Sequence, residues 1–369
     1  MLFRSTPIIN EYYPDLEKIP WLSLGEYPTA VEKLERMGEA RGFSNLYIKR
    51  DDRCNPVYGG NKVRKLEYML GDALQKGKKT LISLGGAGSN QVPAIGIFGS
   101  EMGFNVVGIM MDQPNVLYVR ENLLLDQYYG IKLIYSRNEL SEIASFIIEY
   151  LRLEVGGKKP YFITAGASSE LGNMGFVNAV FELRQQIEKG DAVEPDYIIV
   201  PSASIGTSAG LYLGCKLAGL KTRVIGVRVA MEWLVSKWRM RRMIRAINHF
   251  MRKHDSKVPL VDVNKDDLIL LEDYLGKEYA YFTEVGYDCV NDMIYLENIK
   301  LEPTYTGKAL GGGLDWLKKK GETDANILFW NTYNSIDFSE KTATVDYKNL
   351  PVKFHKYFTE PVQEETWRS

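Results

Sequence analysis

Residues 80–111 read TLISLGGAGSNQVPAIGIFGSEMGFNVVGIMM, and this run establishes the fold class. An apolar segment, Thr80–Leu84, leads through a glycine-rich turn into an amphipathic segment, Gln91–Met102, and a second apolar segment follows at Asn105–Met111. Short apolar segments bounded by turn residues predict buried strands, and the segment between them is long enough for a helix. A strand, a helix and a strand in this order predict two parallel strands with a covering helix.

The same alternation continues through the chain. Further strands are predicted at Lys132–Tyr135, Tyr161–Thr164, Tyr197–Pro201 and Arg223–Val227. Further helices are predicted at Tyr118–Tyr129, Leu140–Leu153, Asn173–Glu188 and Thr207–Leu217. We therefore expect an α/β protein with two doubly wound, three-layer αβα domains whose sheets are mostly parallel.

The chain crosses between the two domains most plainly at Gly156–Pro160, a short polar segment that cannot continue a helix. We expect a large domain formed by residues 1–50 and 158–345, a small domain formed by residues 51–157, and a C-terminal extension over residues 346–369. The basic segment Lys237–Lys257 is interpreted as a helix with one buried stripe, or as a subunit contact, and the alternative is a helix that binds a membrane surface or nucleic acid. The stripe is predicted to contain Trp233, Trp238, Ile244, Ile247 and Met251.

Composition excludes several classes of partner. The chain has 369 residues, of which 45% are hydrophobic, and 46 basic residues balance 47 acidic ones. This balance gives no general attraction to nucleic acid or to an anionic membrane, and no apolar stretch approaches the length of a membrane span. Three dispersed cysteines and three histidines favour neither a disulfide framework nor a metal site. Because Met1–Ser5 does not begin a long apolar segment, we expect a soluble cytoplasmic protein without a cleaved leader.

One lysine is the best candidate for a reactive amine. Residues 59–67 read GGNKVRKLE, in which Lys62 follows a glycine pair and Asn61, a residue expected to cap a helix. Apolar residues then recur at helical spacing until Gly77. Lys62 is therefore placed at the start of a rigid element. The alternative is an ordinary solvated lysine.

A candidate anion site follows the predicted strand at Tyr197–Pro201. Residues 201–210 read PSASIGTSAG, and small residues before a helix let backbone N–H groups approach a phosphate. The hydroxyls of Ser204, Thr207 and Ser208 can add donors, although a tight strand-to-helix connection is the alternative. The loop lacks a Walker lysine and a Rossmann glycine triplet, so a monophosphate cofactor is favoured over a nucleotide.

A second polar turn at residues 85–91, GGAGSNQ, opens another predicted helix. Ser89 and Asn90 either contact a ligand or cap this helix. An amine, a phosphate cradle and a polar turn are together the groups that pyridoxal 5'-phosphate requires.

These motifs resemble those of the aminocyclopropanecarboxylate deaminase and D-cysteine desulfhydrase family, which are pyridoxal-phosphate enzymes of the tryptophan-synthase-β-like fold, fold type II. The resemblance extends from about Ile48 to Thr332. It rests on IKRDD at 48–52, the run at 59–67, the turn at 85–90, AGASSELGNMG at 165–175, the loop at 201–210 and EPTYTGK at 302–308.

The resemblance implies a role for each site residue. Lys62 would hold the cofactor through an imine, and Asn90 would bind the ring hydroxyl. The phosphate would be bound by Ala203, Ser204, Ile205, Gly206, Thr207 and Ser208, within the large domain. The substrate would face Ser89, Asn90, Gln91 and Tyr305, and Tyr279 is a weaker match to a further active-site tyrosine. A buried packing role is the alternative for Tyr305. The resemblance also implies a homodimer.

Two positions indicate which branch this chain follows. Deaminases carry glutamate at the position of Thr306 and leucine at that of Thr332, whereas desulfhydrases carry hydroxyl residues at both, as here. A hydroxyl near the cofactor's ring nitrogen makes the ring a weaker electron sink, which suits β-elimination. The chain departs from the family at Asn331-Thr332-Tyr333-Asn334, where His-Thr-Gly-Gly is usual, and at Val92-Pro93.

The predicted function is therefore β-elimination from a small amino acid such as D-cysteine or a serine-like analogue, giving a 2-oxo acid and ammonia. The alternatives are β-replacement in a biosynthetic pathway of amino-acid metabolism, aminocyclopropanecarboxylate deamination, and a catalytically silent homologue that binds a ligand. The altered turn at 331–334 leaves the substrate, its stereochemistry and the acceptor open.

Overall fold

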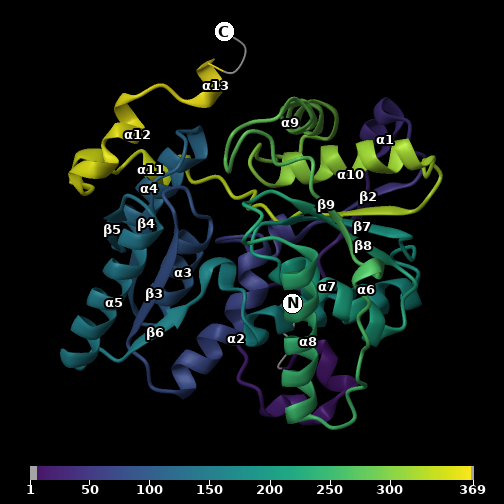
Figure 1. The fold of residues 1–369 in the computed structure, drawn as a ribbon, viewed down its shortest axis with the longest axis horizontal. Helices are drawn as coiled ribbons and strands as arrows, with labels where there is room; N and C mark the ends of the chain where they lie inside the picture. Colours follow the sequence, from purple (N-terminus) through teal and green to yellow (C-terminus); the bar gives the residue numbers. More distant parts are fainter. Residues whose placement is uncertain (1–5, 367–369) are drawn as a thin grey trace. The chain divides into compact units, whose positions relative to one another are not determined.

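The computed structural model describes residues 6–366, with the side chain of residue 366 excepted (Figure 1). Met1–Ser5, on which the expectation of no cleaved leader rests, lie outside this range. The end of the predicted C-terminal extension also lies outside it. The chain divides into a large unit, Met1–Tyr68 with Ser168–Ile336, and a small unit, Met69–Ala167 with Asp337–Ser369. The chain passes from one unit to the other near residues 68, 167 and 336. The domain ranges expected from the sequence stay a prediction.

A six-stranded sheet forms the centre of the large unit, in the order β1-β2-β10-β7-β8-β9. Its strands are β1 (Val31–Lys33), β2 (Leu46–Lys49), β7 (Tyr197–Ser202), β8 (Arg223–Arg228), β9 (Ile269–Leu271) and β10 (Ile327–Trp330). Only β1, at one edge, runs antiparallel to its neighbour. A mostly parallel sheet needs covering helices on both faces, which explains the apolar runs in its strands.

Helices cover both faces of this sheet (Figure 1). One face carries α6 (Glu170–Lys189), α7 (Gly206–Ala218) and α8 (Lys237–His254), and the other carries α1 (Glu35–Arg41), α9 (Glu284–Glu297) and α10 (Thr306–Lys320). Successive side chains of β7 enter opposite cores: Ile198 and Val200 pack with α6 and α7, and Ile199 packs with α10. The large unit is therefore a three-layer αβα structure.

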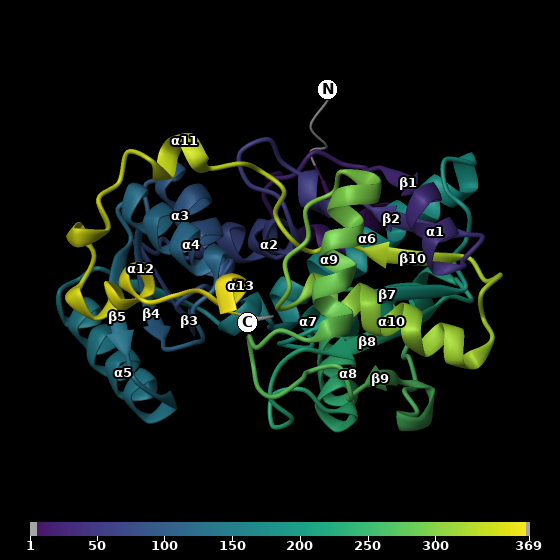
Figure 2. The ribbon, with the colours of Figure 1, turned by 90° about the horizontal axis from the view of Figure 1, so that it is seen from above.

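The small unit contains a four-stranded, fully parallel sheet in the order β5-β4-β3-β6. Its strands are β3 (Thr80–Gly86), β4 (Asn105–Met111), β5 (Lys132–Ser136) and β6 (Pro160–Ile163). The helices that pack around it are α3 (Gln91–Glu101), α4 (Leu117–Tyr128) and α5 (Glu139–Val155). Figure 2 shows the C-terminal helices α11 (Ser339–Thr342), α12 (Lys356–Thr359) and α13 (Gln363–Thr366) running along this unit. Asp112 anchors α12 by accepting hydrogen bonds from Lys356 and Tyr357.

The predicted fold class is confirmed: the chain is α/β with two mostly parallel sheets. Each strand and helix expected above begins and ends within three residues of the observed element. Among residues 6–366, no helix is long and apolar enough to cross a membrane. In the same part of the chain, no three His, Cys, Asp or Glu side chains come together as a metal site.

The expected buried stripe on the basic helix is partly wrong. Ile244, Ile247 and Met251 of α8 are buried, but Trp233 and Trp238 are 55% and 60% exposed. Trp238 lies six residues before Ile244, which places it on another side of the helix, and Trp233 precedes the helix. The stripe is completed instead by Met240, four residues before Ile244, and by Asn248.

Candidate active site

Lys62 is the second residue of α2 (Asn61–Gln75), and a tight approach of the backbone positions it. Gly60 has a φ of 91°, and a Cβ atom there would lie 2.8 Å from the carbonyl oxygen of Thr332. The same carbonyl accepts the backbone N–H of Asn61 at 3.1 Å. Only glycine tolerates both the left-handed conformation and this contact, so the glycine sets where the lysine emerges.

Asn61 links Lys62 to the loop at residues 201–210, the candidate anion site. Lys62 Nζ donates to Asn61 Oδ1 at 2.9 Å, and Asn61 Nδ2 donates to Thr207 Oγ1 at 3.3 Å. The expectation that Asn61 caps the helix is wrong, because Asn61 is the first residue of α2 and its side chain is used in this bridge. The amine is therefore held towards the loop.

The amine of Lys62 loses its proton more readily than an ordinary lysine. Its side chain is partly buried, and burial lowers the pKa of Lys62 to about 8, although the nearby carboxylate of Glu302 acts in the opposite direction. Desolvation disfavours a cation, so this direction follows from its position. An appreciable fraction of the free amine is thus neutral near physiological pH.

The loop before α7 is shaped around Gly206. Ile205 adopts a left-handed conformation with a φ of 66°, and Gly206 begins the helix. A Cβ atom on Gly206 would lie 2.2 Å from Asn173 Oδ1, 2.3 Å from Ser168 Oγ and 2.8 Å from Lys65 Nζ. Three polar side chains therefore converge on the N-terminal end of α7, where the backbone N–H groups and the helix dipole favour an anion.

Polar groups gather at this end of α7. Lys65 Nζ donates to Ser168 Oγ at 3.1 Å, and the Ser168 and Ser204 hydroxyls share a hydrogen bond of 2.8 Å. Asn173 is fully buried, and neither amide atom of its side chain has a hydrogen-bond partner among the described residues. Burying an amide without a partner is costly, so an occupant that supplies both an acceptor and a donor would stabilise it.

Burial lowers the pKa of Lys65 well below its usual range, and the positive charge of Lys62 lowers it further. A bound anion would reverse this destabilisation of the ammonium. No role was predicted from the sequence for Lys65, Ser168 or Asn173. A signal for Lys65 existed, because it lies three residues after Lys62 and so on the same side of a helix.

The remaining loop residues have different positions. Ser208 donates its hydroxyl to the carbonyl of Ile205 at 2.8 Å and accepts from Ser202 at 2.9 Å. Its side chain therefore stabilises the loop from within. Ala203 is partly buried and packs against the core on both sides of the sheet. Any contact of these two residues with a phosphate would come from the backbone.

A buried carboxylate organises the start of α10. Glu302 accepts hydrogen bonds from the backbone N–H groups of Thr304, Tyr305 and Thr306, and from Thr306 Oγ1 at 2.9 Å. Burial raises the pKa of Glu302, while these donors lower it. Thr306 is itself buried, so its hydroxyl proton is directed to Glu302. Its expected contact with the cofactor stays a prediction.

Tyr279 and Tyr305 form a pair. Their hydroxyl groups are joined by a short hydrogen bond. Burial raises the pKa of Tyr279 to about 12, while its bond with Tyr305 lowers it. The structure thus brings together two tyrosines that the sequence analysis named separately.

The unusual turn at residues 331–334 supports the segment before Lys62. Asn334 Oδ1 accepts the backbone N–H of Gly59 at 2.7 Å. Tyr333 is buried, and the ammonium group of Lys300 lies 5.8 Å from the centre of its ring. Asparagine and tyrosine at this turn therefore have structural contacts of their own.

Ser89, Asn90 and Gln91 belong to the small unit. Ser89 Oγ accepts the backbone N–H of Gln91 at 3.2 Å, and Asn90 Oδ1 accepts a hydrogen bond from Asn122 at 2.9 Å. The buried amide of Gln91 donates to Ser83 Oγ at 2.6 Å and to the carbonyl of Thr164 at 2.9 Å. Their assignment to one site with Lys62 stays a prediction.

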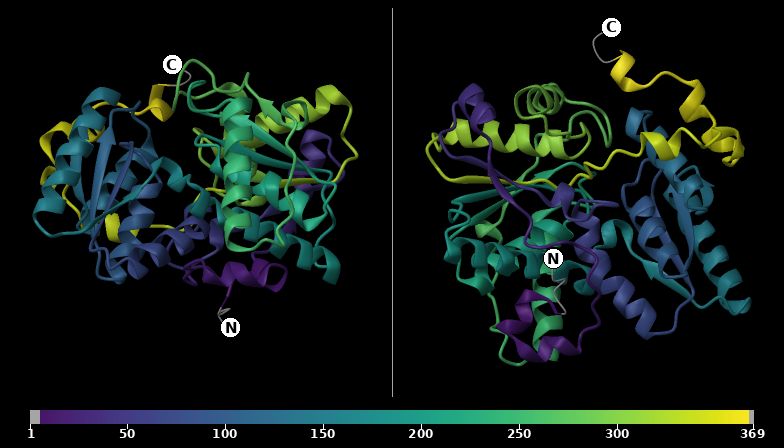
Figure 3. Two further views of the ribbon diagram at one scale, coloured as in Figure 1. Left: turned by 60° about the horizontal axis from the view of Figure 1, so that its bottom comes forward. Right: turned by 180° about the vertical axis from the view of Figure 1, so that it is seen from behind.

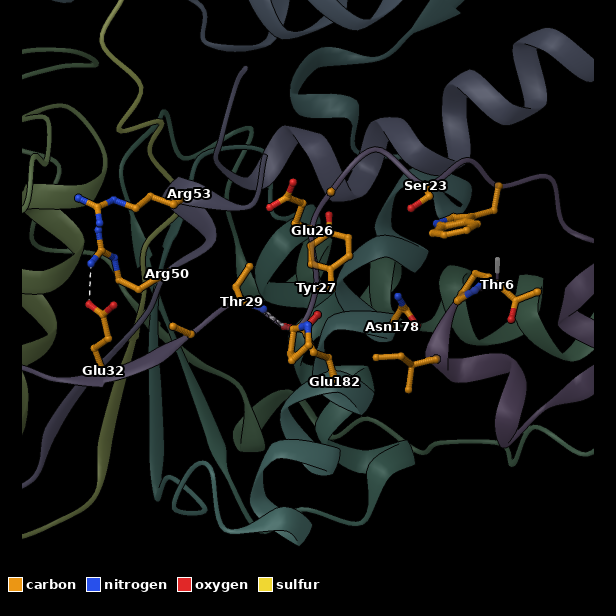
Figure 4. Close-up of a pocket in the computed structure, with 16 residues that line it drawn as sticks. Thr6, Ser23, Glu26, Tyr27, Thr29, Glu32, Arg50, Arg53, Asn178 and Glu182 are labelled. Carbon is orange, nitrogen blue, oxygen red and sulfur yellow. Dashed lines mark hydrogen bonds and ion pairs between the residues drawn. The ribbon is translucent and has the colours of Figure 1, made fainter. Parts of the chain in front are cut away.

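A separate pocket of about 420 Å³ lies in the large unit (Figure 4). Thr29 and Glu182 form part of its wall, and Arg50 pairs with Glu32 at its edge. No residue predicted for the active site lines it. Figure 4 shows Tyr27 beside Thr29, and the hydroxyl of Tyr27 is buried without a hydrogen-bond partner among the described residues.

Residues 22–332 match the family described as pyridoxal-phosphate dependent enzyme. The chain is 34% identical over 324 residues to a Pyrococcus furiosus protein named putative 1-aminocyclopropane-1-carboxylate deaminase, covering 87% of this chain and 92% of that protein. It is 32% identical over 329 residues to the D-cysteine desulfhydrase of Klebsiella pneumoniae, covering 86% and 95%. A crystal structure described as an ACC deaminase homologue superimposes with a TM-score of 0.76 at 30% identity, covering 92% of this chain and 99% of that chain.

Proposed function

Because the chain belongs to the family of pyridoxal-phosphate-dependent enzymes, which confirms the resemblance drawn from its motifs, we propose that it catalyses β-elimination from a small amino acid. It is a lyase with pyridoxal 5'-phosphate as cofactor. The proposed substrate is D-cysteine or a serine-like analogue, and the proposed products are a 2-oxo acid and ammonia. We also propose a cytoplasmic location, in line with three buried cysteines that are free thiols.

The observation that carries this proposal is the bridge from Lys62 through Asn61 to Thr207. It ties an amine with a pKa of about 8 to a loop suited to a phosphate. A cofactor that must be held at an amine and at a phosphate matches this pairing.

The residues present fit the cofactor. Polar atoms of Lys65, Ser168 and Asn173 approach Gly206 so closely that a Cβ atom there would clash with all three. We propose that these side chains and the backbone N–H groups of residues 203–208 hold the phosphate, with Lys65 supplying the positive charge. When bound, the cofactor supplies a conjugated ring that withdraws electrons from the Cα atom of an amino acid.

Lys62 is the proposed base for the proton at Cα. A base near neutral pH needs a pKa near the working pH, and burial brings the amine of Lys62 into that range. Asn61 Oδ1 accepts one N–H of the amine, which orients Nζ. We propose that Nζ removes the Cα proton.

The tyrosine pair supplies a proton at the other end of the substrate. We propose that Tyr305 Oη gives its proton to the departing β-substituent, and that Tyr279 Oη donates a hydrogen bond that stabilises the phenolate left on Tyr305. Tyr305→Phe is expected to lower kcat by on the order of a hundredfold while the cofactor stays bound. Tyr274→Phe, which removes a hydroxyl bonded to Asp315 on another face of α10, is the matched control. Equal losses in both variants would contradict this role.

Thr306 favours elimination over ring opening. The hydroxyl of Thr306 donates a hydrogen bond to Glu302. Threonine at this position has no carboxylate with which to pair the ring nitrogen. A ring nitrogen without a carboxylate partner is less firmly protonated, and the ring is then a weaker electron sink. Elimination of a good leaving group needs less electron withdrawal than opening a cyclopropane.

The test is a substrate panel with the purified holoenzyme. D-cysteine, L-cysteine, D-serine and 1-aminocyclopropane-1-carboxylate are compared by release of sulfide, ammonia and 2-oxo acid. Fastest turnover is expected with a β-substituted substrate. Faster ring opening would identify a deaminase instead, and capture of an added thiol or amine in the product would identify a β-replacement enzyme.

Lys62→Ala is the matching variant. It is expected to remove both the visible absorbance of the bound cofactor and turnover, with a loss of about 10⁴-fold or more. Lys76→Ala, at an exposed lysine just beyond the end of α2, is the control and is expected to keep both. Full ammonia release by Lys62→Ala would refute the assignment, and a protein that takes up no cofactor would indicate a catalytically silent homologue.

A further inference from the structure

The C-terminal segment, residues 337–366, belongs to the small unit. Both views of Figure 3 show this yellow segment beside the blue elements of that unit. It begins after residue 332, the last residue that matches the family. Several of its apolar side chains are buried, namely Phe338, Leu350, Phe354, Tyr357 and Val362. The segment is therefore a packed part of the small unit.

One buried tyrosine joins the C-terminal segment to the end of β4. The hydroxyl of Tyr357 donates to Asp112 Oδ1 at 2.8 Å and accepts the backbone N–H of Gln113 at 3.1 Å. Lys356 also donates to Asp112, at 2.6 Å. Burial raises the pKa of Asp112, but these hydrogen bonds and one from Tyr135 lower it by more. The carboxylate is therefore charged near neutral pH, and it holds its donors by charge-assisted bonds.

The side chain of Gln113 continues this contact to the turn at residues 85–91. Gln113 Oε1 accepts the backbone N–H of Gly88 at 2.9 Å, and Nε2 donates to the hydroxyl of Tyr118 at 3.2 Å. A Cβ atom on Gly88 would lie 2.7 Å from the ring of Tyr118 and 3.0 Å from Gln113 Nε2, so the turn packs closely against both side chains. Gln113 thus links the hydroxyl of Tyr357 to the backbone of the turn.

Asn122 of α4 holds the same turn by a second pair of hydrogen bonds. Its Nδ2 atom donates to the carbonyl of Gly88 and to Asn90 Oδ1, each at 2.9 Å. Because Asn90 Oδ1 accepts this bond, the amide nitrogen of Asn90 is its donor, and a donor is the group that a ring hydroxyl oxygen would bind. The position of α4 therefore determines how Asn90 is oriented.

The C-terminal segment contacts the start of α4 as well. Glu364 accepts the backbone N–H of Leu117, the first residue of α4, at 3.2 Å, and a carboxylate is favourable at this end of the helix dipole. Arg120 donates to the carbonyl groups of Tyr357 and Glu360 at 2.6 and 2.7 Å. Two routes therefore lead from this segment to the turn.

We propose that the C-terminal segment positions the turn at residues 85–91 for the amino-acid substrate, with Tyr357 and Gln113 as positioning residues. The inference rests on the proposed function, in which this turn faces the substrate. The turn contains three glycines, and glycine has more backbone freedom to lose than any other residue. Holding the turn in place before the substrate arrives reduces the entropy that binding would otherwise cost.

Hydrogen exchange of the full-length protein tests the contact without any assay of turnover. Tyr357→Phe removes the hydroxyl and keeps the ring, and the amide of Gly88 is expected to exchange about fivefold faster. Tyr347→Phe is the matched control, because Tyr347 lies in the same segment and stacks its ring on Phe358, which phenylalanine can also do. The control should leave Gly88 unchanged. Equal exchange of Gly88 in Tyr357→Phe and the wild type would overturn the proposal.

Gln113→Met reaches the same link without altering the C-terminal segment. It should also speed the exchange of Gly88, and adding Tyr357→Phe to it should have no further effect, because the two residues act in one chain of hydrogen bonds. Additive effects of the two substitutions would show that Tyr357 does not act through Gln113, and would overturn this route.

Initial rates of the holoenzyme test whether the contact positions the turn for substrate. Tyr357→Phe is expected to raise the KM for the amino acid about fivefold and to change kcat by less than twofold. General destabilisation would instead lower kcat through loss of folded enzyme and leave KM unchanged. Faster exchange of Gly88 with an unchanged KM would overturn the positioning role. A wild type that turns over no amino acid would refute the proposed function, whereas the exchange of Gly88 would still report whether the contact holds the turn.

Discussion

Arg64 and Asp51 form a bidentate ion pair in the interior of the large unit. Arg64 Nε donates to Asp51 Oδ2 and Nη2 donates to Oδ1, each at 2.7 Å, and both side chains are almost fully buried. Glu182 accepts from Nη1 at 2.8 Å, and Trp330 Nε1 donates to Asp51 Oδ2 at 2.6 Å. Arg64 lies two residues after Lys62, so this network fixes the helix that carries the proposed reactive amine.

Removing one charge from this network leaves the others buried without a partner. Asp51→Asn is expected to lower the free energy of unfolding by about 3–5 kcal/mol, measured by urea denaturation. The control is Asp15→Asn, which breaks an exposed pair with Lys18 and should leave the midpoint unchanged. Equal midpoints for Asp51→Asn and the wild type would show that the pair does not hold α2.

A methyl group at Gly206 tests the phosphate cradle. Its Cβ atom would lie within 2.3 Å of Asn173 and Ser168, so Gly206→Ala is expected to weaken binding of pyridoxal phosphate at least tenfold, or about 1.4 kcal/mol. Absorbance titration of the cofactor-free protein measures this. Gly219→Ala lies at the other end of α7, where a Cβ atom meets no neighbour but a φ of 73° strains alanine, so it controls for a general loss of stability and should leave cofactor affinity unchanged. An unaffected affinity in Gly206→Ala would place the phosphate elsewhere.

Lys65 is expected to recognise the phosphate and not the ring. Lys65→Met keeps the length of the side chain and removes its charge, and a charge-assisted bond to a phosphate contributes about 1.5–3 kcal/mol. Affinity for pyridoxal phosphate should therefore fall by at least tenfold, while affinity for pyridoxal, which has no phosphate, should not change. Parallel titrations with the two compounds separate these outcomes. An equal loss for both would indicate a structural role for Lys65.

The lowered pKa of Lys62 predicts how the cofactor-free protein captures pyridoxal phosphate as a function of pH. Only the neutral amine attacks an aldehyde, so the rate should rise with pH through about 8 and level off above it. An ordinary lysine would keep rising to about 10.4. Stopped-flow absorbance gives the profile, and Lys62→Ala should show no capture. A midpoint near 10.4 would mean that burial does not act on this amine.

The strands and helices were predictable because they depend on local pattern. An apolar run such as Asn105–Met111 is buried on both faces of a parallel sheet, and its bounds were predicted without error. Helix α8 shows the limit of this reasoning. Ile244, Ile247 and Met251 are buried as predicted, but Trp238 is exposed, because an apolar residue six positions before Ile244 lies on another side of the helix.

Contiguous motifs allowed a role to be predicted for Lys62 and for residues 203–208, and those roles stay a prediction. Asn61 could not be assigned, because capping and a bridge to Thr207 suit the same residue type. The contact between Lys65 and Ser168 could not be predicted, because the two residues are 103 positions apart and meet only in the folded chain.

Periodicity and motif order along the chain were enough to establish an α/β fold and the family, and to predict a reactive lysine, since each depends on residues that are neighbours in sequence. The convergence of Lys65, Ser168 and Asn173 on Gly206 depended on how α2 and α6 pack against the start of α7. The exposure of apolar side chains on the outer side of α5, among them Leu140, Ile148 and Val155, depended on which side of that helix the sheet covers. An apolar residue has the same local signal whether a neighbour buries it or solvent reaches it, so these features required the packed structure.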